Sequence, residues 1–254
     1  MTTVKICGLK TTETVRAIRH LPIDHIGFVF AESRRRISPE RAKELIAALR
    51  EDGAPPPPAF DAGALPPSGV LPPSEVRESE ARGQLPLTAG VFVNPSIGEL
   101  AQVLDAAPLD IVQLHGTETP EFCREVRKTF GVRVFKTVAV DPSALRGGYA
   151  SDAAASRLDP YLDAIDAVLL DTYDPAAAGG TGRTFAWECI PLYLAWTRRH
   201  GLPLIVAGGL HADNVRELID RYGPDGVDVS SGVETNGEKD IEKIATFVKK
   251  VKGR

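Results

Sequence analysis

The sequence is poor in the residues that staple small folds or bind structural metals. Its 254 residues include three cysteines and one methionine. Cys7, Cys123 and Cys189 lie far apart, form no CxxC pair and have no histidine at ligand spacing, so we expect no metal site. An odd number of cysteines without a secretory leader favours a reducing compartment, and we therefore expect a cytoplasmic protein.

Long apolar runs and basic stripes are also missing. No run of 18 apolar residues occurs, which excludes a membrane-spanning helix and predicts no membrane partner. Lys and Arg number 30 against 34 Asp and Glu, a net charge of −4, and no aromatic residues are interleaved with basic ones. Nucleic acid is therefore not expected as a partner.

Short β-branched runs alternate with amphipathic stretches along the whole chain. The expected strands are Thr3–Cys7, His25–Phe30, Thr88–Val93, Ile111–His115, Val132–Thr137, Ala167–Asp171, Leu204–Ala207 and Val227–Ser230. The expected helices are Thr12–His20, Pro39–Arg50, Ser96–Ala106, Pro120–Phe130, Phe185–Arg199, Ala212–Tyr222 and Lys239–Val251. Strands that alternate with helices indicate a parallel sheet. Eight such units in 254 residues predict an α/β fold, a single (β/α)8 TIM barrel over residues 1–254.

An open, doubly wound sheet is the competing architecture. Such a sheet usually carries G-x-G-x-x-G after its first strand, where this chain has Cys7-Gly8-Leu9-Lys10. The barrel is therefore the preferred interpretation.

The segment Glu51–Pro86 interrupts the alternation. It holds nine of the 20 prolines, and Pro-Pro runs favour extended chain over helix or sheet. We expect a Pro-rich inserted loop between the second helix and the third strand. In a (β/α)8 barrel such a connection lies on the N-terminal face, opposite the active-site mouth.

Ionisable residues share one parity near the ends of several expected strands. In the strand Ile111–His115, Gln113 and His115 lie on one face. Cys7, Asp171 and Asp228 occupy the same parity toward the end of their own strands. Because barrel active sites are built at the C-terminal ends of the strands, we expect these side chains to meet there.

Glycine and serine follow the seventh and eighth expected strands. Gly208 and Gly209 occur in the first loop, and Ser230, Ser231 and Gly232 in the second. These two loops commonly hold a phosphate through backbone N–H groups, and glycine allows the close approach. They therefore predict a phosphate site.

A further glycine cluster follows the sixth expected strand. Gly179, Gly180 and Gly182 are not followed by the lysine of a nucleotide-binding loop. We expect these glycines to serve as hinges of a lid loop.

Taken together, these motifs resemble phosphoribosylanthranilate isomerase of tryptophan biosynthesis. The resemblance covers the chain outside Glu51–Pro86. Its motifs are VKICGL at Val4–Leu9, GFVF and SRRRISP within Gly27–Pro39, GVFVN at Gly90–Asn94, VQLHG at Val112–Gly116, LLDT at Leu169–Thr172, GGTGRTF at Gly179–Phe185, AGGL at Ala207–Leu210 and DVSSGVE at Asp228–Glu234.

The resemblance implies an Amadori rearrangement of N-(5-phosphoribosyl)anthranilate to 1-(2-carboxyphenylamino)-1-deoxyribulose 5-phosphate. It implies a small phosphoribosyl substrate, no cofactor, no metal, and a monomer or homodimer. By resemblance, Asp171 is the general acid that opens the ribose ring and Cys7 the general base that removes the C2 proton. An ordinary Asp titrates near 3.9 and an ordinary Cys near 8.5, so both need tuning. Asp228 is a candidate to raise the pKa of the acid, and Lys5 a candidate to favour the thiolate.

The carboxylate of anthranilate requires a guanidinium fork. Arg34, Arg35 and Arg36 all follow the second strand, and the family pattern S-x-R-x-[IV]-S, placed on Ser33–Ser38, selects Arg35. The spacing before this pattern is shorter than in many relatives, so Arg36 stays an alternative. Gln113, His115 and Asp228 are the other expected substrate contacts.

Two other functions remain open at this point. The histidine-pathway aminoaldose isomerase is a barrel that catalyses the same rearrangement on a bis-phosphate, but it uses a carboxylate where this chain has Cys7. A non-catalytic phosphosugar-binding barrel is the second alternative, and the presence of both Cys7 and Asp171 disfavours it.

Overall fold

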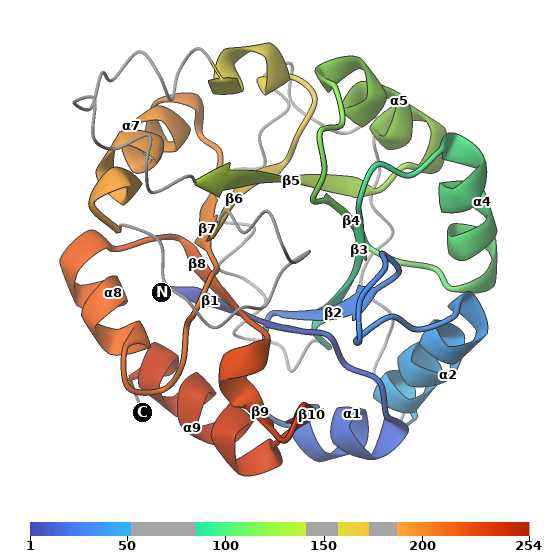
Figure 1. The fold of residues 1–254 in the computed structure, drawn as a ribbon, viewed down its shortest axis with the longest axis vertical. Coiled ribbons are helices and arrows are strands. Elements are labelled where there is room, and N and C mark those ends of the chain that lie inside the picture. Colours follow the sequence, from blue (N-terminus) through green and yellow to red (C-terminus); the bar gives the residue numbers. More distant parts are fainter. Residues whose placement is uncertain (52–84, 141–156, 173–186, 254) are drawn as a thin grey trace.

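The protein folds as a closed barrel of eight parallel strands. The computed structural model describes residues 1–51, 85–140, 157–172 and 187–253. Each strand pairs with its neighbour in chain order, and β8 closes the ring on β1. Helices surround the strands as an outer ring (Figure 1). The predicted (β/α)8 architecture is confirmed, and the open sheet is excluded because an open sheet would leave two edge strands.

The strands begin and end within a few residues of the expected positions. They are β1 Thr3–Cys7, β2 His25–Val29, β3 Leu87–Phe92, β4 Ile111–Leu114, β5 Arg133–Val140, β6 Ala167–Thr172, β7 Leu204–Val206 and β8 Gly226–Val229. The largest difference is at β5, which continues to Val140 rather than ending at Thr137. Residues 138–140 remain paired because β6 also extends, to Thr172.

Capping residues explain where most helices begin. The helices are α1 Thr12–Ile18, α2 Pro39–Arg50, α4 Ile97–Ala106, α5 Pro120–Phe130, α7 Ile190–His200, α8 Val215–Tyr222 and α9 Ile241–Lys252. The hydroxyls of Ser38, Ser96 and Thr119 accept backbone N–H groups at the starts of α2, α4 and α5. Proline occupies a first-turn position in α2 and α5, where its missing N–H is not needed.

Three helices begin two or more residues later than the hydrophobic pattern predicts. α7 follows a short 3₁₀ turn, Trp187–Cys189, because Pro191 fits only the first turn of an α-helix. Before α8, the Asn214 side chain closes a turn by accepting the N–H of His211, at 2.9 Å. Asp240 caps α9, which therefore starts at Ile241.

The two faces of the barrel strands pack into two separate apolar cores. The larger core lies between barrel and helices and includes Val112 and Leu114. A second core fills the barrel itself and is made by Ala89, Ile111, Phe135, Ala167, Leu169, Ile205 and Ala207. The alternation read from the sequence therefore assigns the two faces correctly.

Aspartates tie neighbouring strands together at the N-terminal end of the barrel. One stands directly before each of β2, β4, β6 and β8, and accepts a backbone N–H from the strand before it in the ring. The contacts are Asp24 with Val4 (2.7 Å), Asp110 with Thr88 (2.7 Å), Asp166 with Val134 (2.8 Å) and Asp225 with Leu204 (2.9 Å). This end of the barrel is thus built for stability, which leaves the opposite end for chemistry.

The connection that carries the Pro-rich insertion leaves α2 and returns to β3. Its first residue, Glu51, accepts two hydrogen bonds of 2.7 Å from Arg16 of α1. Its end, Leu85, packs against the larger core. Residues 52–84 lie outside the described part of the chain.

Candidate active site

Polar side chains gather inside the barrel near the C-terminal ends of the strands. Cys7 ends β1, His115 follows β4, Asp171 lies near the end of β6 and Asp228 lies on β8. Cys7 and Asp228 are buried, whereas His115 and Asp171 are half-buried. These are the four ionisable residues that strand parity selects.

Cys7 lies beside a buried ion pair. The Nζ of Lys5 is 2.9 Å from Oδ2 of Asp228, and both side chains are almost fully buried. Burial would lower the pKa of Lys5, but attraction to Asp228 and Cys7 outweighs it and raises the pKa above its ordinary value. Gly27 of β2 makes room for this cluster, because a Cβ there would lie 2.9 Å from the Cys7 sulfur.

The charged residues around Cys7 shift the pKa of its thiol in opposite directions. Burial raises the pKa of the thiol, and Asp228 adds to that rise, whereas Lys5 lowers the pKa. Burial prevails, so the free protein holds a thiol at neutral pH. Lys5 therefore acts in the expected direction, but its effect on the pKa of the thiol is smaller than that of burial.

His115 and Asp171 face each other across the mouth. Nε2 of His115 lies 3.5 Å from Oδ2 of Asp171. Burial lowers the pKa of His115 to about 4; Asp228 opposes this effect and Lys136 adds to it. At neutral pH the imidazole is uncharged and brings no positive charge to Asp171.

The loop that carries His115 is held by a buried ion pair that sequence reasoning missed. Lys136 Nζ lies 2.9 Å from Oε2 of Glu118, and it also donates to the carbonyl of Gly116 at 2.7 Å. Glu118 in turn accepts the backbone N–H groups of Gly116 and Asn94. Lys136 is on the outward face of β5 and Glu118 is in a loop, so no alternation pattern marks them.

Unpaired acceptors lie inside the barrel. Within the described residues, Oε1 of Gln113 and Oδ1 of Asp228 are buried without a hydrogen-bond partner. The Gln113 amide nitrogen reaches Thr137 at 3.4 Å. Buried acceptors without partners are costly, and the hydroxyl groups of a ligand would satisfy them.

The two loops expected to bind phosphate pack against each other. Gly208 and Gly209 both have positive φ, 82° and 63°. A Cβ on Gly232 would overlap the backbone carbonyl of Leu210 in the neighbouring loop. Ser230 anchors the second loop by donating its hydroxyl to the carbonyl of Cys7, at 3.1 Å. Ser231 follows it at the start of a 3₁₀ turn and is half-buried.

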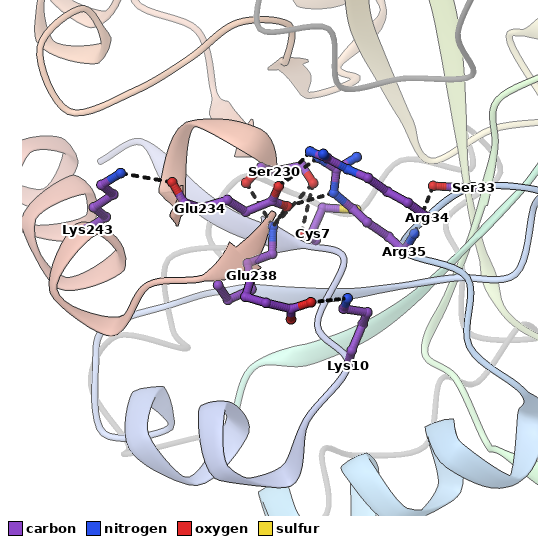
Figure 2. Close-up of polar contacts among 10 residues, drawn as sticks. Cys7, Lys10, Ser33, Arg34, Arg35, Ser230, Glu234, Glu238 and Lys243 are labelled. Atoms are coloured by element: carbon purple, nitrogen blue, oxygen red, sulfur yellow. Dashed lines mark hydrogen bonds and ion pairs between the residues drawn. The ribbon is translucent and has the colours of Figure 1, made fainter. Parts of the chain in front are cut away.

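Of the three consecutive arginines, Arg35 alone points inward. It is 5% exposed, whereas Arg34 and Arg36 are exposed. Its stem crosses Gly8, where a Cβ would lie 2.6 Å from Cδ of Arg35, and Gly8 has φ of 81°. Figure 2 shows Arg35 beside Cys7 and pointing toward Glu234. The structure thus favours Arg35 over Arg36 for a site role.

Other expectations fall outside the described residues or concern absences. Gly179, Gly180 and Gly182, the predicted lid glycines, are not described. In the described ranges, no His, Cys, Asp or Glu side chains cluster as metal ligands would. No helix there is long and apolar enough to cross a membrane.

Known proteins match this chain over nearly its whole length. Residues 71–250 match the family model described as N-(5'phosphoribosyl)anthranilate (PRA) isomerase. The N-(5'-phosphoribosyl)anthranilate isomerase of Brevibacillus brevis is 42% identical over 99% of this chain and 94% of its own. That match runs across the Pro-rich segment, which the motif resemblance left out.

Solved structures of phosphoribosylanthranilate isomerases also match this chain over its full length. Monomers of the dimeric phosphoribosylanthranilate isomerase of Thermotoga maritima are 31% identical, with full coverage of both chains and a TM-score of 0.68. Another structure of such an isomerase is in complex with reduced 1-(o-carboxyphenylamino)-1-deoxyribulose 5-phosphate; it is 31% identical with full coverage of both chains and a TM-score of 0.65.

Proposed function

The chain belongs to the N-(5'-phosphoribosyl)anthranilate isomerase family, and from this membership we propose which of its residues carry the reaction. The enzyme isomerises N-(5-phosphoribosyl)anthranilate to 1-(2-carboxyphenylamino)-1-deoxyribulose 5-phosphate in tryptophan biosynthesis. The observation that carries the proposal is the convergence of Cys7 and Asp171 at the C-terminal mouth of the barrel.

Asp171 acts first, as the general acid. It gives a proton to the ring oxygen, the bond from C1 to that oxygen breaks, and the nitrogen lone pair forms a protonated Schiff base. His115, 3.5 Å away, is uncharged at neutral pH and so places no positive charge beside the carboxyl group.

Cys7 acts second, as the general base. It takes the C2 proton, and the electron pair moves to the cationic nitrogen to give an enolamine that tautomerises to the ketone. The free thiol has a raised pKa. The adjacent iminium charge, together with Lys5, supplies the attraction that forms the thiolate.

The remaining contacts bind three parts of the substrate: the carboxylate, the phosphate and the sugar. Arg35 holds the anthranilate carboxylate. Backbone and hydroxyl donors of Gly208, Gly209, Ser230, Ser231 and Gly232 hold the phosphate. Gln113, His115 and Asp228 face the sugar, and the unpaired oxygens of Gln113 and Asp228 accept its hydroxyls.

Steady-state turnover of phosphoribosylanthranilate tests these assignments. Cys7→Ala and Asp171→Asn should each lower kcat by about 10²–10⁴, the usual contribution of a positioned acid or base. Arg35→Met should impair turnover far more than Arg34→Met or Arg36→Met. If a variant keeps most of the wild-type activity, the residue that it replaces does not have the assigned role.

We propose that the whole chain is one domain and that 52–84 is a passive connection on the N-terminal face. Replacing 52–84 by a short Gly/Ser linker, with Leu85 kept because it packs on the core, should leave kcat and KM within about twofold, since closure entropy changes slowly with loop length. Loss of soluble expression would show that the segment docks.

We further propose a monomer or homodimer in the cytoplasm, without a nucleic-acid partner. The Thermotoga maritima relative is described as dimeric. Light scattering on the intact chain and on the shortened chain measures the oligomeric state, and dissociation on shortening would assign the segment to an interface.

A further inference from the structure

Arg35 is already held by a carboxylate of the protein. Its Nε donates to Oε1 of Glu234 at 2.7 Å, and its Nη2 donates to Oε2 at 3.0 Å. The two groups form a side-on fork, and both side chains are buried. In Figure 2 Glu234 comes from the β9–β10 hairpin (β9 Glu234–Thr235, β10 Glu238–Lys239) and meets Arg35 close to Cys7.

This arrangement leaves one edge of the guanidinium available. A guanidinium has five N–H donors, and Glu234 uses Nε–H and one proton of Nη2. Within the described residues, Glu234 alone accepts hydrogen bonds from this group. The outer edge, formed by Nη1 and Nη2, still presents two parallel N–H donors that match a second carboxylate.

Glu234 is itself held in place. Lys239, its partner across the two-stranded β9–β10 sheet (Glu234–Thr235 and Glu238–Lys239), donates to Oε1 at 2.8 Å. Lys239 also donates to the carbonyl of Ser230 at 2.8 Å. The chain of contacts therefore runs from the expected phosphate loop through Lys239 and Glu234 to Arg35.

The local charge balance remains positive. Arg34, Arg35 and Lys239 all contact Glu234, so one carboxylate faces three cations. Burial would raise the pKa of Glu234, but hydrogen bonds from Arg35 and Lys239 more than offset it and lower the pKa to about 2. Glu234 is thus charged at any working pH, and the surplus positive charge favours binding of an anionic group.

We propose that Glu234 is a positioning residue, which orders Arg35 before the substrate arrives and thereby sets the selectivity for a substrate with a ring carboxylate. This inference rests on the proposed role of Arg35. A long side chain that is already ordered loses little further freedom on binding, so the carboxylate is bound at lower entropic cost. The same contacts hold the guanidinium at a fixed distance from the phosphate loop.

The test compares two ligands that differ only in the carboxylate. One is reduced 1-(2-carboxyphenylamino)-1-deoxyribulose 5-phosphate, and the other is its aniline counterpart without the carboxylate. Calorimetry gives the ratio of the two Kd values. In Glu234→Gln the preference for the carboxylated ligand should fall by about tenfold, the factor that the freedom of one long side chain represents. General loosening of the fold cancels in this ratio.

Glu238→Gln is the matched control. Glu238 is on the facing strand of the same hairpin and is exposed, and it pairs with Lys10 at 2.8 Å. This variant removes the same charge without touching Arg35, so the ratio should not change.

The outcomes separate the two claims. If Arg35→Met keeps the wild-type ratio, the proposed carboxylate site is wrong. If Arg35→Met abolishes the preference while Glu234→Gln keeps it, the positioning role is overturned. A higher preference in Glu234→Gln would show that Glu234 competes with the substrate, which also overturns the role.

Should Glu234→Gln fail to fold, the wild-type protein provides the measurement. The Nε–H resonance of Arg35, assigned by its loss in Arg35→Met, should exchange slowly with solvent without ligand and keep its shift when the carboxylated ligand binds. A rapidly exchanging resonance in the free protein would contradict the inference.

Discussion

Replacing Lys5 by methionine should strongly destabilise the barrel. The substitution nearly keeps the side-chain volume but removes the cation that is 2.9 Å from Asp228. Lys5 is 1% and Asp228 7% exposed, and Oδ1 of Asp228 has no described partner, so the carboxylate would be left buried and unpaired. Breaking such a pair from one side costs about 3–5 kcal/mol. At this chain length, where 1 kcal/mol shifts Tm by about 2–4 °C, Tm should fall by roughly 6–20 °C.

The double variant Lys5→Met/Asp228→Asn provides the decisive comparison. Because neither partner is charged, most of the lost stability should return, although substrate binding should stay impaired. Guanidinium unfolding of the wild type, both single variants and the double variant at pH 7 measures the coupling. A cost below about 1 kcal/mol for Lys5→Met, or additive effects in the double variant, would refute the argument that the pair is a closed electrostatic unit.

The pH dependence of the stabilisation by the Lys5–Asp228 pair determines the pH at which unfolding is measured. The pKa of Lys5 is raised in the folded protein. The stabilisation is therefore complete below the ordinary lysine value near 10.4 and is lost as the pH rises through the higher folded value. Measurements at pH 7 report the pair at full strength.

Three further predictions concern the active site, the N-terminal end of the barrel and two buried histidines. Gly27→Ala should lower kcat about tenfold, because its Cβ would stand 2.9 Å from the Cys7 sulfur and displace it; unchanged turnover would exclude a tight fit around the thiol. Asp110→Ala should cost about 1–3 kcal/mol in urea unfolding and leave kcat unchanged, since it removes a backbone contact at the N-terminal end; a fall in kcat at intact stability would contradict this. Burial lowers the pKa of His25 to about 3 and of His115 to about 4, so unfolding free energy should decline as pH falls from 6.5 toward 4, by up to about 1.4 kcal/mol per pH unit for each; a flat profile would show that both are protonated without cost.

The fold and the inward residues could be predicted because the pleat of a strand imposes a strict alternation. Once β4 is recognised, Gln113 must face opposite to Val112, and the same rule places Cys7 and Asp171 inside. Strand alternation does not apply to Arg34, Arg35 and Arg36, because they lie in the loop after β2. In the sequence only the family pattern singles out Arg35, whereas in the structure Arg35 is buried and its two neighbours are exposed.

The charge pairs that organise the site could not be predicted in this way. Glu234 meets Arg35 across 199 positions of sequence, and Lys136 on β5 reaches Glu118 in the loop after β4. No local periodicity encodes such partners, because they depend on how loops return over the closed barrel. The balance of effects on the pKa of Cys7 could not be predicted for a related reason: the sequence shows the nearby Lys5, but the burial that outweighs it exists only in the folded protein.

That balance at Cys7 imposes an order on the chemistry. Burial keeps the sulfur protonated in the free enzyme, and Lys5 alone does not reverse this effect. A thiol beside a neutral furanose is therefore a poor base. In the proposed mechanism, once Asp171 has opened the ring, the positive charge of the Schiff base would lie next to the sulfur and favour the thiolate in a site of low dielectric. We infer that the base becomes competent only after the acid has acted.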